Sequence, residues 1–351
     1  MKKNNFLITG GYGFIGSCLV RELLKNQDNR ICNIDKLSYS SSIDSIKPNG
    51  EDNYKFKKID IVESNKIKEV ISEFEPDYII HLAAESHVDR SIDNPDQFIK
   101  SNINGTYNLL NEGYHYWKLL PDDKKLSFRF IHVSTDEVYG SLSEKESAFL
   151  ENSVYKPNSP YSASKASSDH LVYSWYKTYS FPINIVNTSN NYGPWQFPEK
   201  LIPLVISKCL KGEKIPIYGN GLQIRDWIRV EDHVNGLLTV LDKGIIGEKY
   251  NIGANCEKTN LQVVHDICSI LDEVIPNKEY KYNTLINFVE DRPGHDQRYA
   301  INSNKLKNLG WNPSVSWEEG IKDVINWYLN NKNFLNLENN GTYSGERLGR
   351  L

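Results

Sequence analysis

The chain has 351 residues, of which 39% are hydrophobic and 25% are charged, so it can bury a sizeable core as one large α/β unit or as two lobes. Its formal net charge of −4 gives it no general electrostatic attraction to nucleic acids or anionic lipids. The five cysteines include no C-x-x-C pair, so we expect a metal-free protein with reduced thiols. We see neither a signal peptide nor a run of about 18 apolar residues, so we expect a cytoplasmic protein.

Short apolar runs alternate with helical patterns through the first half of the chain. Strands are predicted at Phe6–Thr9, Arg30–Asp35, Tyr78–Ala83, Phe128–Ser134 and Ile183–Asn187. Helices are predicted between them, at Ile15–Lys25, Lys66–Phe74, Asn102–Tyr116 and Ser162–Tyr179. This alternation predicts an α/β fold, a doubly wound parallel sheet with helices on both faces.

The pattern changes after about residue 190. Asn191–Pro194 and Phe197–Pro198 are typical of loops, and a helix at Leu201–Leu210 and a strand at Ile215–Tyr218 are predicted to follow. We predict a first domain over 1–190, to which 226–258 returns. A smaller mixed α/β domain is predicted from 191–225 and 259–335, with a peripheral tail at 336–351.

The first predicted strand leads directly into a glycine-rich turn. Gly10, Gly13 and Gly16 satisfy G-x-x-G-x-x-G, and a helix follows. Glycines allow a pyrophosphate to approach bare backbone, and the helix N-terminus offers it N–H groups. Asp35 ends the second strand about 20 residues further on, where an acid binds the adenosine ribose and favours NAD over NADP. The alternative, a plain glycine turn, does not explain this context.

Tyr161 and Lys165 are four residues apart and share one helix face. A lysine cation beside a phenol lowers the pKa of the tyrosine, which can then take a proton from an alcohol while hydride leaves. The pair alone is more often a solvated helix face. It is informative here because a dinucleotide-binding turn precedes it.

Asp136 and Glu137 follow a buried strand, at the sheet edge where ligands of α/β proteins bind. Adjacent carboxyls at such a position are often a helix cap or surface acids. Their functional interpretation is an acid and a base whose pKa values are split by repulsion and unequal burial.

At this point the sequence resembles the extended short-chain dehydrogenase/reductases, and within them the nucleoside-diphosphate-glucose 4,6-dehydratases. The resemblance spans nearly the whole chain. The matching segments are Thr9–Ser17, His81–Ser91, Ser134–Gly140, Tyr161–Ala166, Asn190–Pro194, Phe197–Pro203, Tyr218–Asp232 and Asp291–Tyr299. The Thr-Asp-Glu triplet at 135–137 is its most specific element, since related epimerases carry small hydroxyl residues there.

The resemblance implies a Rossmann-type fold, bound NAD and a complete reaction cycle. Tyr161, supported by Thr135 and Lys165, would take the C4 hydroxyl proton of the sugar as hydride leaves C4. Glu137 would then remove the C5 proton, and protonated Asp136 would help the C6 hydroxyl to leave as water. Hydride would finally return to C6, with reprotonation at C5, giving a 4-keto-6-deoxy sugar.

The resemblance also implies which side chains bind the two ligands. The expected cofactor residues are Gly10, Gly13, Phe14, Ile15, Gly16, Asp35, Lys36, Asp60, Ile61, Ala83, Ala84, Ser134, Tyr161, Lys165 and Asn190. The expected substrate residues are Ser86, His87, Thr135, Asn190, Lys200, Leu201, Pro216, Tyr218, Arg225, Asn260, Arg292, His295 and Tyr299. Among the latter, Lys200, Arg225 and Arg292 would bind the diphosphate, because arginine forks suit phosphate oxygens.

Three departures from the family pattern concern ligand fit, namely Tyr12, Ser40–Ile43 and Arg229. They leave the nucleotide base open, with dTDP-glucose expected and UDP- or CDP-glucose as alternatives. A 4-epimerase or a decarboxylase on the same scaffold is a further alternative, and a non-enzymatic sensor is another. The resemblance also implies a homodimer built through helices near Asn102–Tyr116 and Ser162–Tyr179.

Overall fold

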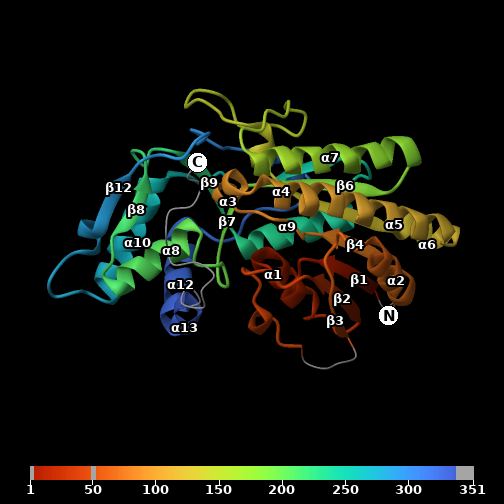
Figure 1. Ribbon diagram of the computed structural model, residues 1–351, viewed down its shortest axis with the longest axis horizontal. Helices are drawn as coiled ribbons and strands as arrows, with labels where there is room; N and C mark the ends of the chain where they lie inside the picture. The colour runs from red at the N-terminus through yellow and green to blue at the C-terminus, as the bar shows by residue number, and fades with distance from the viewer. Residues whose placement is uncertain (1–3, 49–52, 337–351) are drawn as a thin grey trace.

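The computed structural model describes residues 4–48 and 53–336, and its centre is a seven-stranded parallel sheet (Figure 1). The strand order is β10-β6-β5-β4-β1-β2-β3. Their bounds are β1 Asn4–Thr9, β2 Asn29–Asp35, β3 Tyr54–Lys58, β4 Tyr78–His81, β5 Arg129–Thr135, β6 Ile183–Thr188 and β10 Lys249–Ile252. The predicted doubly wound parallel sheet is confirmed.

Alternate residues of the strands face opposite helical layers. Phe6 and Ile8 of β1 pack in one core with α1 (Phe14–Leu23) and α9 (Val230–Lys243). Leu7, between them, packs in the opposite core with α2 (Ser64–Phe74), α5 (Gly105–Leu119) and α7 (Pro160–Tyr179). Apolar runs with no alternation are what a sheet buried on both faces requires.

Shorter helices connect these layers. They are α3 Val88–Asp93, α4 Pro95–Phe98, α6 Asp122–Ser127 and a π-helix at Ile99–Asn104 that runs into α5. Short 3₁₀ turns occupy Ile43–Ser45, Asp136–Tyr139 and Tyr282–Leu285. The predicted helix at Asn102–Tyr116 therefore exists, but it begins earlier and its first turns are π-helical.

Two sequence-based assignments are wrong in detail. The strand predicted at Tyr78–Ala83 ends at His81, because Leu82 and Ala83 turn toward a cavity. The loop predicted at Asn191–Pro194 contains part of a strand, β7 (Asn190–Tyr192). β7 pairs with β9 (Ile224–Arg229), and a partner more than thirty positions away leaves no local sequence signal.

The second lobe holds two smaller sheets around its own apolar core, on the left of Figure 1. β7 and β9 form one with β11 (Glu257–Thr259), and β8 (Ile215–Tyr218) pairs with β12 (Ile286–Val289) in the other. The helices of this part are α8 Leu201–Lys211, α10 Asn260–Val274, α12 Trp317–Asn330 and α13 Lys332–Leu335, whereas the short α11 (Asn304–Lys307) packs against α9 and β10 of the main domain.

Within the predicted returning segment, α9 packs against α1 and β10 extends the main sheet, whereas β9 and β11 lie in the three-stranded sheet. The domain boundaries stay a prediction. The predicted tail, from 337 onward, lies outside the described residues. No helix in the described ranges combines the length and the apolar character that crossing a bilayer requires.

Candidate active site

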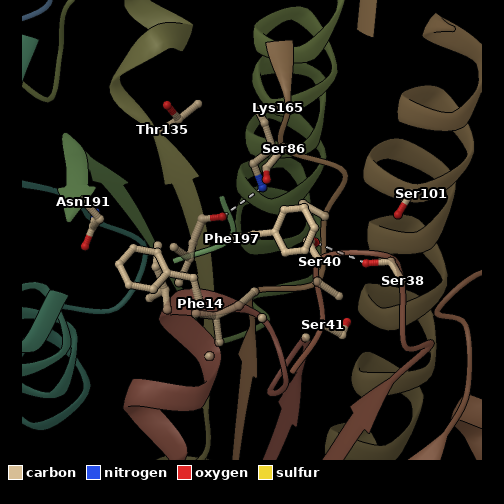
Figure 2. A pocket seen from close by; sticks show the side chains of 18 of the residues that line it. Phe14, Ser38, Ser40, Ser41, Ser86, Ser101, Thr135, Lys165, Asn191 and Phe197 are labelled. Carbon is tan, nitrogen blue, oxygen red and sulfur yellow. Dashed lines mark hydrogen bonds between the residues drawn. The ribbon is translucent and has the colours of Figure 1, made fainter. Parts of the chain in front are cut away.

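A cavity of about 290 Å³ opens at the carboxyl ends of the main strands. Every expected cofactor residue and every expected catalytic residue lines it. In Figure 2, Thr135 and Asn191 lie on one side of this pocket, Ser38, Ser41 and Ser101 lie on the other, and Lys165 points in from α7. The structure thus brings the two predicted groups together in one place.

The glycine turn leaves no room for side chains. A Cβ on Gly16 would lie 2.1 Å from the carbonyl oxygen of Gly10, and a Cβ on Gly10, whose φ is +74°, would lie 2.7 Å from the Ala83 nitrogen. α1 then starts with no acidic residue in its first turn and no side-chain cap on its N-terminus. Its first N–H groups therefore face the cavity as donors for an anion.

Asp35 is held rigidly at the other end of the cavity. Its Oδ2 accepts from the Tyr12 backbone N–H at 3.0 Å, and its Oδ1 accepts from the Leu37 N–H at 2.8 Å and the Ser41 hydroxyl at 3.2 Å. Lys36 beside it pairs with Glu85 at 2.7 Å. A fixed carboxylate here suits ribose hydroxyls and repels a 2′-phosphate, so the site fits NAD better than NADP.

The three departures from the family pattern leave the cavity open. The Tyr12 ring is buried against Phe56, with ring centroids 4.9 Å apart, while its backbone serves Asp35. Ser40 and Ser41 line the cavity with small polar side chains. Arg229 pairs with Glu231 at 2.6 Å and donates to the Gly320 carbonyl, away from the cavity lining.

Tyr161 and Lys165 stand in the first turns of α7. The helix starts at a capping box formed by Ser159 and Ser162, which fixes the position of its N-terminus. The Lys165 Nζ donates to the Val133 carbonyl at 2.8 Å. Burial lowers the pKa of Lys165 to about 8, against the opposing charge of Asp169.

The pKa of Tyr161 shifts opposite to our expectation. Burial and then the Glu137 carboxylate raise it, and the hydrogen bond with Thr135 lowers it only in part. The lowering of the Tyr161 pKa that we expected from Lys165 does not outweigh these effects, because the phenol is buried next to a negative charge.

Asp136 and Glu137 begin the 3₁₀ turn that follows β5, and Thr135 caps this turn by accepting from the Glu137 backbone N–H at 3.3 Å. Asp136 is only 2% exposed, and its Oδ2 has no hydrogen-bond partner within the described ranges. Burial, then Glu137 and Asp226, raise its pKa well above the usual range. This favours a protonated Asp136.

Glu137 has different electrostatic surroundings. Burial raises its pKa, but the cations of Arg292, Arg225 and Lys200 oppose that rise. The pKa of both carboxyls is raised, but the cations limit the rise for Glu137, so Asp136 is the one that its surroundings favour more strongly in the protonated form.

The expected substrate residues divide into two sets. Ser86, Thr135, Asn190 and Lys200 line the cavity. The others do not belong to its lining: His87, Leu201, Pro216, Tyr218, Arg225, Asn260, Arg292, His295 and Tyr299. Pro216 and Tyr218 lie in β8, Leu201 begins α8 and Asn260 begins α10, so these residues belong to the second lobe.

Two residues outside the lining, Arg225 and Arg292, still bring positive charge to Glu137. The Arg225 guanidinium lies over the Tyr299 ring, 4.2 Å from its centroid. Arg292 pairs with Asp89 at 2.7 Å, and the Tyr218 hydroxyl donates to the other oxygen of Asp89 at 3.0 Å. His295 lies 2.6 Å from Asp291, and the His87 Nε2 lies 3.9 Å from Glu199.

Sequence reasoning missed a cluster at the edge of the cavity, formed by Tyr39, Arg90 and Glu199, which we call the clasp. Glu199 accepts from the Tyr39 hydroxyl at 2.7 Å and from the Arg90 Nε at 3.0 Å, and the Arg90 guanidinium stacks on the Tyr39 ring at 4.0 Å. The three residues come from separate segments. A charged Glu199 set between Phe197-Pro198 and Leu201 was the one available signal.

Other cavity residues were not among the expected binding residues, although Ser40 and Ser41 belong to a segment named above for its effect on ligand fit. Besides Glu199, they are Ile34, Ser38, Ser40, Ser41, Ile59, Leu82, Ser101, Val133, Thr188, Ser189, Asn191, Gln196 and Phe197. In the described parts of the chain, no group of three or more His, Cys, Asp or Glu side chains could hold a metal ion.

Known proteins of one enzyme family match this chain over nearly its whole length. Residues 7–324 match the profile of the GDP-mannose 4,6 dehydratase family. A dTDP-glucose 4,6-dehydratase of Escherichia coli is 50% identical over 356 residues, with 98% of both chains covered. That of Haemophilus influenzae is 51% identical over 332 residues, with 93% of this chain and 98% of that protein covered.

Solved structures agree. The dTDP-glucose 4,6-dehydratase of Bacillus anthracis, in complex with NAD, has a TM-score of 0.82 at 41% identity and covers 94% of this chain and 98% of its own. The Streptomyces venezuelae enzyme of the same name has a TM-score of 0.85 at 36% identity, with the same coverage. A UDP-glucose 4-epimerase of Thermotoga maritima reaches 0.81 at 28% identity, covering 93% of this chain and 99% of its own.

Proposed function

Because the chain belongs to the dTDP-glucose 4,6-dehydratase family of extended short-chain dehydrogenase/reductases, we propose that it is a hydro-lyase that converts dTDP-glucose to dTDP-4-keto-6-deoxyglucose with bound NAD. The observation that supports this most directly is the presence of Asp136 and Glu137 in one cavity with Tyr161 and Lys165. A 4-epimerase needs only the latter pair.

The cavity fits NAD in three respects. The glycine turn can hold a pyrophosphate, Asp35 can bind the adenosine ribose with Asp60 and Ile61 beside it, and Ser134, Tyr161, Lys165 and Asn190 line the inner end. When bound there, NAD would supply the hydride acceptor for oxidation at C4 and the hydride donor for reduction at C6, where a proton returns to C5, and it would be regenerated in every turnover. It therefore acts as a prosthetic group.

The protein supplies the proton transfers. Tyr161 removes the proton of the C4 hydroxyl, and Thr135 and the Lys165 cation stabilise the phenolate. Once C4 is a ketone, the C5 proton is acidic and Glu137 removes it. Asp136, kept protonated by its burial, donates to the C6 hydroxyl as it leaves as water.

The second lobe supplies cations for the substrate diphosphate. Lys200 lines the cavity, and Arg225 and Arg292 lie close enough to Glu137 to oppose the rise in its pKa that burial causes. Cations fixed at these positions suit the two negatively charged phosphate groups of the substrate, next to Glu137 as the proposed base.

The assignment is tested by incubating the protein with dTDP-glucose and following the 4-keto product through its near-ultraviolet absorbance in alkali. UDP-glucose and CDP-glucose are assayed in parallel, and we expect the highest turnover with dTDP-glucose. Clean conversion to a galactose epimer, or higher turnover with another nucleotide, would contradict the proposal.

We also propose a cytoplasmic homodimer. The five thiols are all unpaired, which suits a reducing compartment. Exposed aromatic residues lie on the two adjacent helices of the resemblance-based interface, Tyr107 on α5 and Tyr173 and Tyr179 on α7. Light scattering after gel filtration should give twice the monomer mass, and the Tyr107→Lys, Tyr173→Lys double variant should give the monomer mass.

A further inference from the structure

Asp169 is a buried carboxylate behind the cavity that the proposed reaction does not use. It lies on α7, one turn after Lys165 and two turns after Tyr161, so the three side chains share one helix face. It is 2% exposed. A buried carboxylate is costly unless its surroundings stabilise it, so its contacts indicate its role.

Those contacts join α7 to three other segments. Asp169 Oδ2 accepts from the Tyr155 hydroxyl at 2.8 Å and from the Asn187 side-chain amide of β6 at 3.2 Å. The same amide donates to the Thr135 carbonyl at 3.2 Å, next to Asp136. Asp169 therefore sets the position of the helix that carries Tyr161 against the strand end that carries Thr135.

The second oxygen of Asp169, Oδ1, carries negative charge that acts on the site. Oδ1 lies 3.3 Å from the His132 Nε2 of β5 but has no hydrogen-bond partner within the described ranges. Burial lowers the pKa of His132 to about 4, so this imidazole is neutral at physiological pH. The remaining negative charge acts on Lys165, whose pKa it raises against the larger effect of burial.

Other titratable groups in these surroundings do not replace that charge. Tyr155 and Tyr139 have raised pKa values and stay neutral. Lys249 of β10 is a further cation within the field of Asp169. His81 of β4 has a pKa well below its usual value because of burial, and the charge of Lys165 lowers it further.

We propose that Asp169 is a positioning residue for C4 oxidation, which holds Tyr161 and Lys165 against Thr135 and keeps the buried Lys165 side chain charged. The inference rests on the proposed function, because it assigns a role within that reaction. A purely structural role would give a different result. Loss of the Asp169 charge should shift the pH dependence of kcat, whereas loss of its hydrogen bonds should lower kcat at every pH.

The test compares the pH profile of kcat for Asp169→Asn with that of the wild-type protein. Asparagine keeps the shape and removes the charge, so Lys165 should lose its proton at lower pH. The basic limb of the profile should move down by about one pH unit or more, giving roughly a tenfold loss at high pH. At the acidic end the two proteins should differ by less than about threefold.

Two variants separate charge from packing. Tyr155→Phe removes one hydrogen bond and keeps the carboxylate, so kcat should fall at every pH with an unchanged basic limb. Asp232→Asn is the matched control, since Asp232 is equally buried and accepts hydrogen bonds from Ser314 and Val315 in another part of the fold. It should lower the melting temperature and leave the profile unshifted.

An unshifted basic limb in Asp169→Asn, with a uniform loss at all pH values, would overturn the inference. If that variant does not fold, Asp169→Glu decides: its limb should stay in place, and a shifted limb would overturn the inference equally. A wild-type protein that leaves dTDP-glucose unchanged would refute the proposed function instead, so the two failures are distinguishable.

Discussion

Asp136 and Glu137 are neighbours in the chain, yet their side chains have unequal surroundings. Asp136 is almost fully buried and close to two further carboxyls, whereas Glu137 lies within the field of three cations. This difference supports the proposed roles of Asp136 as proton donor and Glu137 as proton acceptor, because environment and not residue type decides the pKa.

Tyr161→Phe removes the proposed base for C4 oxidation and leaves the cavity shape unchanged. We expect kcat to fall by about two to four orders of magnitude, which is the usual contribution of a positioned acid or base. The rate of nicotinamide reduction in a single turnover measures it. Unchanged reduction would mean that another group takes the proton.

Asp136→Asn and Glu137→Gln should slow elimination more than oxidation. Both variants keep Tyr161 and Lys165, so the reduced cofactor should accumulate while water release falls by about two orders of magnitude or more. Rapid-quench analysis of product, followed together with the absorbance of reduced nicotinamide, separates the two steps. A block at hydride transfer alone in both variants would contradict these roles.

At this scale the sequence predicted the residues that end parallel strands. Ser134–Glu137 and Asp35 could be placed because such strand ends meet along one edge of the sheet. Arg225 and Arg292 could not be placed, since their positions depend on how the second lobe closes. Nor could the clasp, in which Tyr39, Arg90 and Glu199 come together from three segments.

At the scale of elements, the turn between β1 and α1 tolerates side-chain substitution poorly. Gly16 lies where the helix passes closest to the turn, and any side chain there meets the Gly10 carbonyl oxygen. Helix and strand periods predicted this βα unit well, because its residues interact with near neighbours. They missed β7, which depends on a distant partner strand, and they missed the π-helical start of α5.

Gly16→Ala should therefore abolish retention of NAD. Its Cβ would lie 2.1 Å from backbone, so the turn must shift. We expect the purified variant to contain less than about a tenth of the NAD of the wild-type protein, as measured by release on denaturation. Gly113→Ala in α5 is the control, because its nearest contact, at 3.3 Å, is the movable Ile79 side chain. Equal NAD contents would contradict the steric argument.

At the scale of the whole molecule, the proposed catalytic acid, Asp136, should lower the free energy of unfolding at neutral and higher pH. The pKa of Asp136 is higher in the folded than in the unfolded chain, so its contribution to stability is fully present below its unfolded value and is lost as pH rises through the folded value. Asparagine is neutral at every pH. Asp136→Asn should therefore be more stable than the wild-type protein at pH 8, by on the order of 1 kcal/mol.

Urea unfolding at pH 8 and at about pH 4 checks this sign. The difference between the two proteins should narrow as the pH falls, because Asp136 is then neutral in the folded chain and about half protonated in the unfolded chain. A wild-type protein that is the more stable one at pH 8 would show that Asp136 is ionised and well stabilised there.

β10 adds a constraint on how the chain is made. It pairs with β6, but Lys249–Ile252 follows Thr188 only after the first part of the second lobe and α9 have been synthesised. At the usual ~5–20 residues per second, a ribosome leaves the outer edge of β6 without its neighbour for roughly 3 to 13 s. During that interval the nascent sheet exposes open N–H and C=O groups to other chains, and only the arrival of a late, short strand ends that exposure.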